Sequence, residues 1–494
     1  MKSRSLKSIW VVAGVLTMYM GAASAQSFRV QCPETTALHP DANAKAAGQI
    51  KCQHIGGGDG FATMGDGNQI YLFGFAPLSG LGDVNATTPV DGILTGKPGT
   101  QPAAVFNNQA PTNTLRTKVE PADIMNSGVL YSNAPAPMIA IDEDDELFLT
   151  LSNVGQIMRP DLFEQHTVHF HGYPNASSFF DGVPDASVAI NIAGSFTYYY
   201  TAPDAGTYFW HCHIAPPEHL QMGMVGQLFV RPRQNRLTVN DDLFDALKAA
   251  NNKNTATVTP RTVTADSSGK CSDILCTGAT PLPAVNTAAK GGAKFAYNDG
   301  DGTTRYDVEQ PLQMMGFDPN FHFVGMTFNP EAFSDMKDKY FLLNGRGYPD
   351  TVNTNGPITT LGADGMSRPS QPVASLITLN RSGCDSANTP SSTCQTRALL
   401  RISDLSVTEH TTLATLGVTM TVIAQNARLL RDLAGNNLYY DTNSVTLGGG
   451  ESVDVIIDVT HVPPGTYYLY STNLDHLSND AENFGGMMTE IQVL

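Results

Sequence analysis

Two short segments of the sequence concentrate residues that bind metal ions. Half of the twelve histidines lie within residues 166–171 and 211–219, and the second segment also contains a cysteine. Two imidazoles, one thiolate and a weakly bound thioether are the ligands of electron-transfer copper sites. We therefore predict a blue-copper site with four ligands: His166, Cys212, His219 and Met224.

The other four histidines of these segments form two pairs with one residue between the members of each pair. His169 and His171 are the first pair, and His211 and His213 lie on either side of Cys212. Because side chains alternate between the two faces of a strand, each pair shares one face while Cys212 points to the other. Two such strands side by side would gather four imidazoles. We predict a second metal site there, with catalytic function.

Zinc is the competing ion, because zinc also binds histidine and cysteine. A methionine ligand is typical of copper sites rather than zinc sites, so Met224 favours copper. The pairing of the other cysteines leaves Cys212 available as a metal ligand. Six of the seven pair with a near neighbour, and an oxidising compartment would convert these pairs to disulfides. They are Cys32 with Cys52, Cys271 with Cys276, and Cys384 with Cys394, which leaves Cys212 free.

Residues 1–25 have the features of a secretory signal. Three basic residues precede an apolar run from Ile9 to Met20, and the small residues 23–25 come before Gln26. We expect cleavage there and a secreted or periplasmic protein. The run is too short to span a membrane, and no other segment has about 18 uninterrupted apolar residues, so we expect no membrane span.

The charge of the chain restricts its partners. The formal net charge is −17, and the leader contains three basic and no acidic residues, so the mature chain would have a charge of −20. Such an acidic surface disfavours nucleic acid and anionic lipid as partners.

The composition predicts an all-β chain with two β-sandwich domains. Charged residues are only 15% of the sequence, and glycine and proline are frequent, which is typical of many short strands and turns. We predict an irregular N-terminal extension over residues 26–125, a copper-bearing domain over 126–233, a linker over 234–305 and a second domain over 306–494.

An approximate repeat supports the two-domain interpretation. Gly206-Thr-Tyr-Phe-Trp-His-Cys-His corresponds to Gly465-Thr-Tyr-Tyr-Leu-Tyr-Ser-Thr, and Gly223-Met-Val-Gly corresponds to Gly486-Met-Met-Thr. In the second copy Tyr470, Ser471 and Thr472 replace the His-Cys-His segment. We therefore expect the second domain to lack a blue-copper site.

These motifs resemble those of the multicopper oxidases. The resemblance rests on His166-Thr-Val-His-Phe-His-Gly and on His211-Cys-His-Ile with the later His219 and Gly223-Met224, and it extends to Ala136-Pro-Met-Ile-Ala, Asp181-Gly-Val-Pro and Phe341-Leu-Leu-Asn-Gly-Arg. It implies that the two sandwich domains are cupredoxin-like Greek-key β-sandwiches, with a type 1 copper at the blue site of the first. It also implies a type 2/type 3 copper cluster at His169, His171, His211 and His213, where the family reduces dioxygen.

The histidine count departs from the family pattern. A complete trinuclear cluster takes eight histidines in four H-x-H pairs, and this chain supplies two pairs, so a homotrimer would not add the missing motifs. Six histidines are unpaired: His39, His54, His322, His410, His461 and His476. Among them, His410 and His476 best match the copper segments of the first block, and His461 is expected at a loop end.

Three functions follow from this pattern. The first is a multicopper oxidase-like oxidoreductase that takes single electrons from a small-molecule or protein donor and passes them to a second copper centre, with dioxygen as acceptor. The second is a non-enzymatic copper-binding or electron-transfer protein. The third is a copper nitrite reductase-like enzyme, although the type 2 ligand that such enzymes take from a neighbouring subunit falls near Thr472 here.

Overall fold

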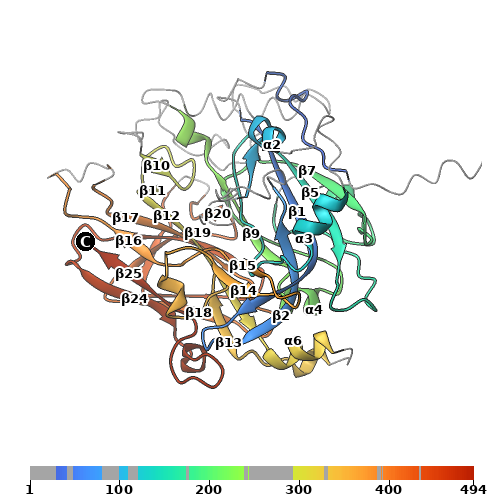
Figure 1. Cartoon of the computed structure of the whole chain (residues 1–494). Helices are drawn as coiled ribbons and strands as arrows, with labels where there is room; N and C mark the ends of the chain where they lie inside the picture. The colour runs from blue at the N-terminus through green and yellow to red at the C-terminus, as the bar shows by residue number, and fades with distance from the viewer. Residues whose placement is uncertain are drawn as a thin grey trace, which may run out of the picture.

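The computed structural model describes residues 29–41, 48–79, 99–109, 121–173, 177–237, 243, 293–327, 332–385, 391, 393–432 and 436–494. Within these ranges the chain forms two packed β-sandwiches with a few short helices at their edges (Figure 1). The predicted all-β fold with two sandwich domains is confirmed. In the described part of the chain, no helix combines the length and apolar character that crossing a bilayer requires.

The first sandwich places two sheets face to face. One sheet has the order β2-β1-β5-β7, with β3 paired to β1, and the other has the order β4-β9-β8-β6. The strands are β1 (Ile50–Thr63), β2 (Gln69–Pro77), β3 (Gln101–Pro102), β4 (Ile139–Asp142), β5 (Glu146–Gly155), β6 (His169–Phe170), β7 (Ser195–Thr201), β8 (Gly206–His211) and β9 (Val225–Arg231). Alternate residues of β5 (Leu147, Leu149 and Leu151) enter the core that also contains Trp210 of β8.

Short helices connect these strands. They are α2 (Ala103–Gln109), α3 (Pro121–Gly128) and α4 (Pro216–Gln221), together with the 3-10 turns η2 (Ser178–Phe180) and η3 (Arg233–Arg236). Of these, α4 follows β8 and carries His219.

The second sandwich also consists of two sheets, and each has more strands than its counterpart in the first sandwich. Its sheets have the orders β13-β12-β17-β23-β19-β20, with β21 paired to β19, and β16-β25-β24-β18-β22. The strands are β12 (Val308–Phe317), β13 (Tyr340–Leu343), β16 (Ile377–Leu379), β17 (Arg397–Asp404), β18 (Thr411–Leu416), β19 (Met420–Gln425), β20 (Arg428–Leu429), β21 (Tyr440–Thr442), β22 (Ser444–Leu447), β23 (Ser452–Asp458), β24 (Gly465–Ser471) and β25 (Met488–Val493). Here β12 runs parallel to β17, as β1 runs parallel to β5 in the first sandwich.

Smaller elements complete this half of the molecule. They are the hairpin β14 (Ile358–Leu361) with β15 (Ser367–Gln371), helix α6 (Pro319–Met326), and the 3-10 turns η5 (Phe333–Asp335), η6 (Asp350–Val352) and η7 (Leu474–Leu477). Helix α6 packs against β2 of the first sandwich.

The N-terminal segment differs from the prediction of an irregular extension. Strands β1 and β2 fall within residues 26–125, and β1 lies between β2 and β5 in the sheet of the first sandwich. Glycine is depleted in strands, so the run Gly56-Gly-Gly-Asp-Gly concealed β1 in the sequence. The segment is therefore part of the first sandwich.

Much of the predicted linker, residues 234–305, lies outside the described residues. Its described end forms the two-stranded sheet of β10 (Lys294–Phe295) and β11 (Arg305–Tyr306). The leader (residues 1–25) and the pair Cys271 and Cys276 also lie outside the described residues.

The described cysteines follow the predicted pairing. Disulfides join Cys32 to Cys52 and Cys384 to Cys394, and Cys212 is free and buried. The first bridge attaches Cys32, which precedes β1 in the chain, to Cys52 within β1.

A buried polar cluster joins the two sandwiches. The Arg401 side chain of β17 is fully buried, bonds the Glu309 carboxylate at 2.8 Å and donates to the Thr207 hydroxyl of β8 at 3.1 Å. Thr207 in turn donates to Asp454 at 2.6 Å. Breaking a buried ion pair leaves an uncompensated charge, so the pair of Arg401 and Glu309 should be costly to disrupt. Through Thr207, β8, the strand that leads into the His-Cys-His segment, is bonded to this cluster.

Candidate metal centre

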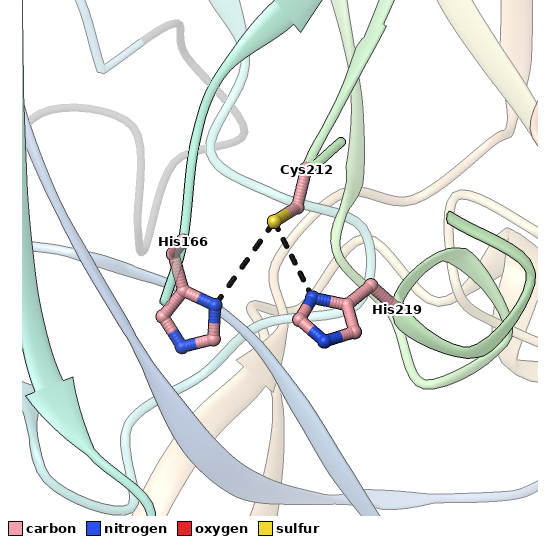
Figure 2. Close-up of side chains that lie close together, drawn as sticks. All are labelled: His166, Cys212 and His219. Carbon is pink, nitrogen blue, oxygen red and sulfur yellow. Dashed lines mark hydrogen bonds between the residues drawn. The ribbon is translucent and has the colours of Figure 1, made fainter. Parts of the chain in front are cut away.

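Three fully buried donors meet at one point of the first sandwich. His166 precedes β6, Cys212 follows β8 and His219 lies on α4, and their ligand atoms lie within 4.8 Å of one another. The Nδ1 atoms of His219 and His166 face the Cys212 Sγ at 3.3 and 4.0 Å (Figure 2). Two imidazole nitrogens and one sulfur around a dry point fit the donor set of a copper ion.

Met224 belongs to the same loop, and backbone hydrogen bonds connect it to the other two residues. Its N–H donates to the carbonyl of His219 at 2.8 Å, and its carbonyl accepts from the N–H of Cys212 at 3.1 Å. The methionine side chain is buried in the same core cluster as Cys212. Backbone hydrogen bonds therefore link the three residues of this loop that are predicted to be ligands.

The segment predicted to be an extension forms one wall of this site. A methyl group on Gly57 of β1 would lie 2.6 Å from Cδ2 of His166, closer than the two atoms can approach. From β2, the Phe73 ring contacts the His219 ring edge to face at 5.1 Å. Gly57 and Phe73 are functional neighbours that the sequence analysis missed, and the glycine run in β1 was the available signal.

Electrostatics favour a thiolate at Cys212. Burial opposes its ionisation, but the charge of His219 and the hydrogen bonds with His166 and His219 hold the pKa of the thiol well below its usual range. Burial would also lower the pKa of His219, yet Cys212 and Glu164 raise it to about 9. A thiolate is the form that binds metal, and an entering cation would displace the proton from His219.

The four remaining histidines of the two segments also converge. In the β6–β8 pair His169 lies directly opposite His211. The His169 ring centroid is 5.4 Å from that of His171, 5.4 Å from that of His211 and 5.0 Å from that of His213. The ligand atoms of His169, His171 and His211 lie within 4.8 Å of one another. The structure thus brings together His166, Cys212 and His219 of the first predicted site and the four histidines of the second.

Hydrogen bonds orient two of these imidazoles. Nδ1 of His211 lies 2.7 Å from the carbonyl of Cys212, and Nδ1 of His169 lies 2.7 Å from the carbonyl of Asp181. A carbonyl only accepts, so each Nδ1 carries a proton. Nε2 of His211 lies 3.0 Å from Nε2 of His171, and burial lowers the pKa of His211 to about 3. The neutral imidazole of His211, with its tautomer fixed by the hydrogen bond to the carbonyl of Cys212, is prepared to bind a metal ion.

A cavity lies between the two sandwiches beside His171. The cavity has a volume of about 350 Å³ and is lined from the first sandwich by His171, Phe209 and Leu220. From the second sandwich it is lined by Glu409 and His410, among others. His410 is exposed and lines the same cavity as His171.

His476 lies elsewhere. It is buried beside Phe341, its Nδ1 lies 3.0 Å from the Ser471 hydroxyl, and its Nε2 lies 3.2 Å from a Glu409 carboxylate oxygen. His461 is exposed in the turn before β24, as expected.

The three other unpaired histidines have structural partners. His39 contacts Glu146 through Nδ1 at 2.6 Å. The ring of His322 lies between the carbonyls of Tyr71 and Gln221. Nε2 of His54 lies 2.8 Å from the Ser152 hydroxyl. These contacts place the three rings outside both donor clusters.

Comparison with known proteins identifies the segment that carries both clusters. The family model for multicopper oxidases matches residues 113–235. Laccase abr2 of Aspergillus fumigatus is 33% identical over 124 residues, which cover 24% of this chain and 20% of the laccase. A copper-containing nitrite reductase of Neisseria meningitidis is 26% identical over 163 residues, covering 31% of this chain and 39% of the reductase. The resemblance to multicopper oxidases is thus confirmed for this segment, and each match spans less than half of the relative.

Among solved structures, the blue copper oxidase of Nitrosomonas europaea aligns with a TM-score of 0.49 and 16% identity. The alignment covers 90% of this chain and 85% of that chain.

A methyl group at position 57 should disturb the blue site. Gly57→Ala is expected to push His166 off its position and to cost about 1–3 kcal/mol of stability, as overpacking does. The measurements are the visible spectrum of the copper-loaded protein and its unfolding midpoint. Gly325→Ala is the matched control, because its added methyl would lie 3.4 Å from Met222, an ordinary contact. A spectrum identical to that of the wild type would contradict the packing of β1 on His166.

The buried His54 should make stability depend on pH. Burial lowers the pKa of His54 from 6.5 to about 3, so between these values the unfolded chain binds a proton that the folded chain does not. Relative to His54→Gln, the metal-free wild type should therefore lose about 1.4 kcal/mol of unfolding free energy per unit as the pH falls below 6.5. Denaturant unfolding of both proteins at pH 7, 6 and 5 measures the difference. A constant difference would refute the neutral, buried state.

Proposed function

We propose that the chain is a multicopper oxidase-like oxidoreductase. It takes single electrons from a small-molecule or protein donor at a blue copper held by His166, Cys212, His219 and Met224. A second copper centre at the four-histidine cluster passes them to dioxygen. Its disulfides and the predicted leader fit a secreted or periplasmic location, and a homotrimer is compatible with the proposal.

The observation that carries the proposal is the covalent connection between the two donor sets. His211 and His213 are the direct chain neighbours of Cys212, and the carbonyl of Cys212 accepts the hydrogen bond from Nδ1 of His211. Copper, when bound, supplies one-electron redox chemistry at both sets. The protein contributes fixed donors, exclusion of water from the buried Cys212, and a short bonded path from the sulfur to the second cluster.

The converging imidazoles favour an enzyme over an electron carrier. A carrier needs one metal ion, whereas the chain brings a second set of imidazole donors together beside the first. The cavity beside His171 supplies space for a small acceptor, and His410 supplies a further imidazole from the second sandwich. Both features support a reaction centre at the junction of the two sandwiches.

Metal content and colour test the central claim. The Cu(II)-loaded wild type should absorb strongly in the visible region through charge transfer from Cys212, and Cys212→Ser should bleach this band while the fold persists. Copper analysis separates the alternatives, because four ions per chain favour the oxidase, two favour a nitrite reductase-like enzyme and one favours the carrier. A colourless, copper-loaded wild type would contradict the proposal.

Removing the imidazole of His410 should affect the second centre alone. His410→Gln is expected to lower dioxygen consumption with a phenolic donor by about tenfold or more, the scale of losses from groups that support a metal site. The blue absorption should stay unchanged. His461→Gln serves as the control, because His461 is an exposed histidine of the same domain. Unchanged turnover in His410→Gln would show that the cluster works without the second sandwich.

A further inference from the structure

The loop between β24 and β25 repeats the backbone hydrogen bonds of the copper loop between β8 and β9. In the first sandwich the N–H of Cys212 donates to the carbonyl of Met224 at 3.1 Å. In the second, the N–H of Ser471 donates to the carbonyl of Met487 at 2.9 Å. Ser471 therefore stands at the position of the thiolate, and Met487 stands at the position of the methionine.

His476 repeats His219 in the same way. In each loop the N–H of the methionine donates to the carbonyl of the histidine at 2.8 Å. In each loop Nδ1 of the histidine faces the side chain at the thiolate position. The distance is 3.3 Å from His219 to the Cys212 sulfur and 3.0 Å from His476 to the Ser471 hydroxyl.

A carboxylate and an aromatic ring accompany both histidines. Nε2 of His219 lies 3.8 Å from Glu164, and Nε2 of His476 lies 3.2 Å from Glu409. The ring of Phe73 in β2 contacts His219. The corresponding ring in β13, Phe341, stacks on His476 at 3.9 Å.

The remaining ligand position is identified by strand pairing. His166 forms a β-bridge with Ile190, which lies five residues before the start of β7. Thr411 pairs with Leu447, which lies five residues before the start of β23. Thr411 therefore stands where the first sandwich has His166.

We propose that the second sandwich retains a dismantled metal site. Its histidine, methionine, carboxylate and aromatic wall are present, and Ser471 and Thr411 replace the thiolate and the other imidazole. A neutral hydroxyl is a poor ligand for copper or cobalt compared with a thiolate, so the loss of affinity is local to these two positions. The scaffold itself should still accept a late divalent transition metal ion once the two donors are restored.

The Ser471–His476–Glu409 chain has the connectivity of a hydrolase triad, but its surroundings exclude that chemistry. The side chain of Ser471 is fully buried, and Phe341 covers the ring of His476. A substrate carbonyl needs to reach the hydroxyl, as in a working triad. The hydrogen bonds are therefore interpreted as the remainder of the metal loop.

The test restores the two donors in a protein that lacks the first thiolate. Cys212→Ser is the parent, and the restored variant adds Ser471→Cys and Thr411→His. Co(II) is the probe, added to metal-free protein, because it does not oxidise a thiol. We expect a thiolate-to-cobalt absorption band and one more bound Co(II) per chain than in the parent. Adding His476→Gln to the restored variant should abolish both.

Three outcomes would overturn the proposal. The first is a folded restored variant, with the far-ultraviolet circular dichroism of the parent, that binds no additional Co(II). The second is a band that survives His476→Gln, which would place the metal elsewhere. If the restored variant fails to fold, Cys212→Ser/Ser471→Cys is measured instead. The absence of a thiolate band in that protein is the third outcome.

This proposal goes beyond the proposed function, and its failure is distinguishable from failure of that function. The thiolate of Cys212 is read out in the wild type, whereas the restored site is read out in proteins without that thiolate. A colourless copper-loaded wild type would therefore not affect the Co(II) test of the restored variant. Failure of the Co(II) test would likewise not affect the interpretation of the wild-type spectrum.

Discussion

The register of β6 against β8 determines where the metal-binding side chains lie. With His169 opposite His211, alternation from the end of β8 into the two residues after it presents His211 and His213 to one side and Cys212 to the other. A slip of one residue would exchange these faces and separate the sulfur from His166. The separation of one sulfur site from one imidazole cluster therefore follows from a single strand pairing.

The second sandwich acts on the first through buried polar contacts. Arg401, Glu309 and Asp454 lie among the strands next to β8, where unpaired charges would be costly. These contacts connect β8 to the second sandwich, and His410 of that sandwich lines the cavity beside His171. The second sandwich thus contributes walls to the cavity at its junction with the first.

The residues of both donor clusters could be predicted from the sequence because each cluster is defined by residue type and spacing. His166, Cys212 and His219 are brought together as predicted. Strand β1 was missed, since its glycines weaken the strand signal while Gly57 meets a packing need that is visible only in three dimensions. Neither could sequence separate His410 from His476, because the difference depends on how the two sandwiches dock.

The relation between the two metal loops was only partly visible for a similar reason. Cys212 and His219 are seven residues apart, whereas Ser471 and His476 are five apart. Because of this difference in spacing, a gap-free sequence alignment does not place His476 opposite His219. The shared backbone hydrogen bonds recover it, because they record position in the fold and do not depend on loop length.

The position of β1 sets a limit on how far the chain can be shortened. A protein beginning near residue 126 would match the segment most similar to known oxidases, yet it would lack the parallel partner of β5. The exposed edge of β5 would then be open to pairing with another chain, which is a common route to aggregation. Its metal pocket would also open to water on the side that Gly57 and Phe73 now close. The minimal copper-binding unit therefore begins before Ile50, well upstream of the recognisable motifs.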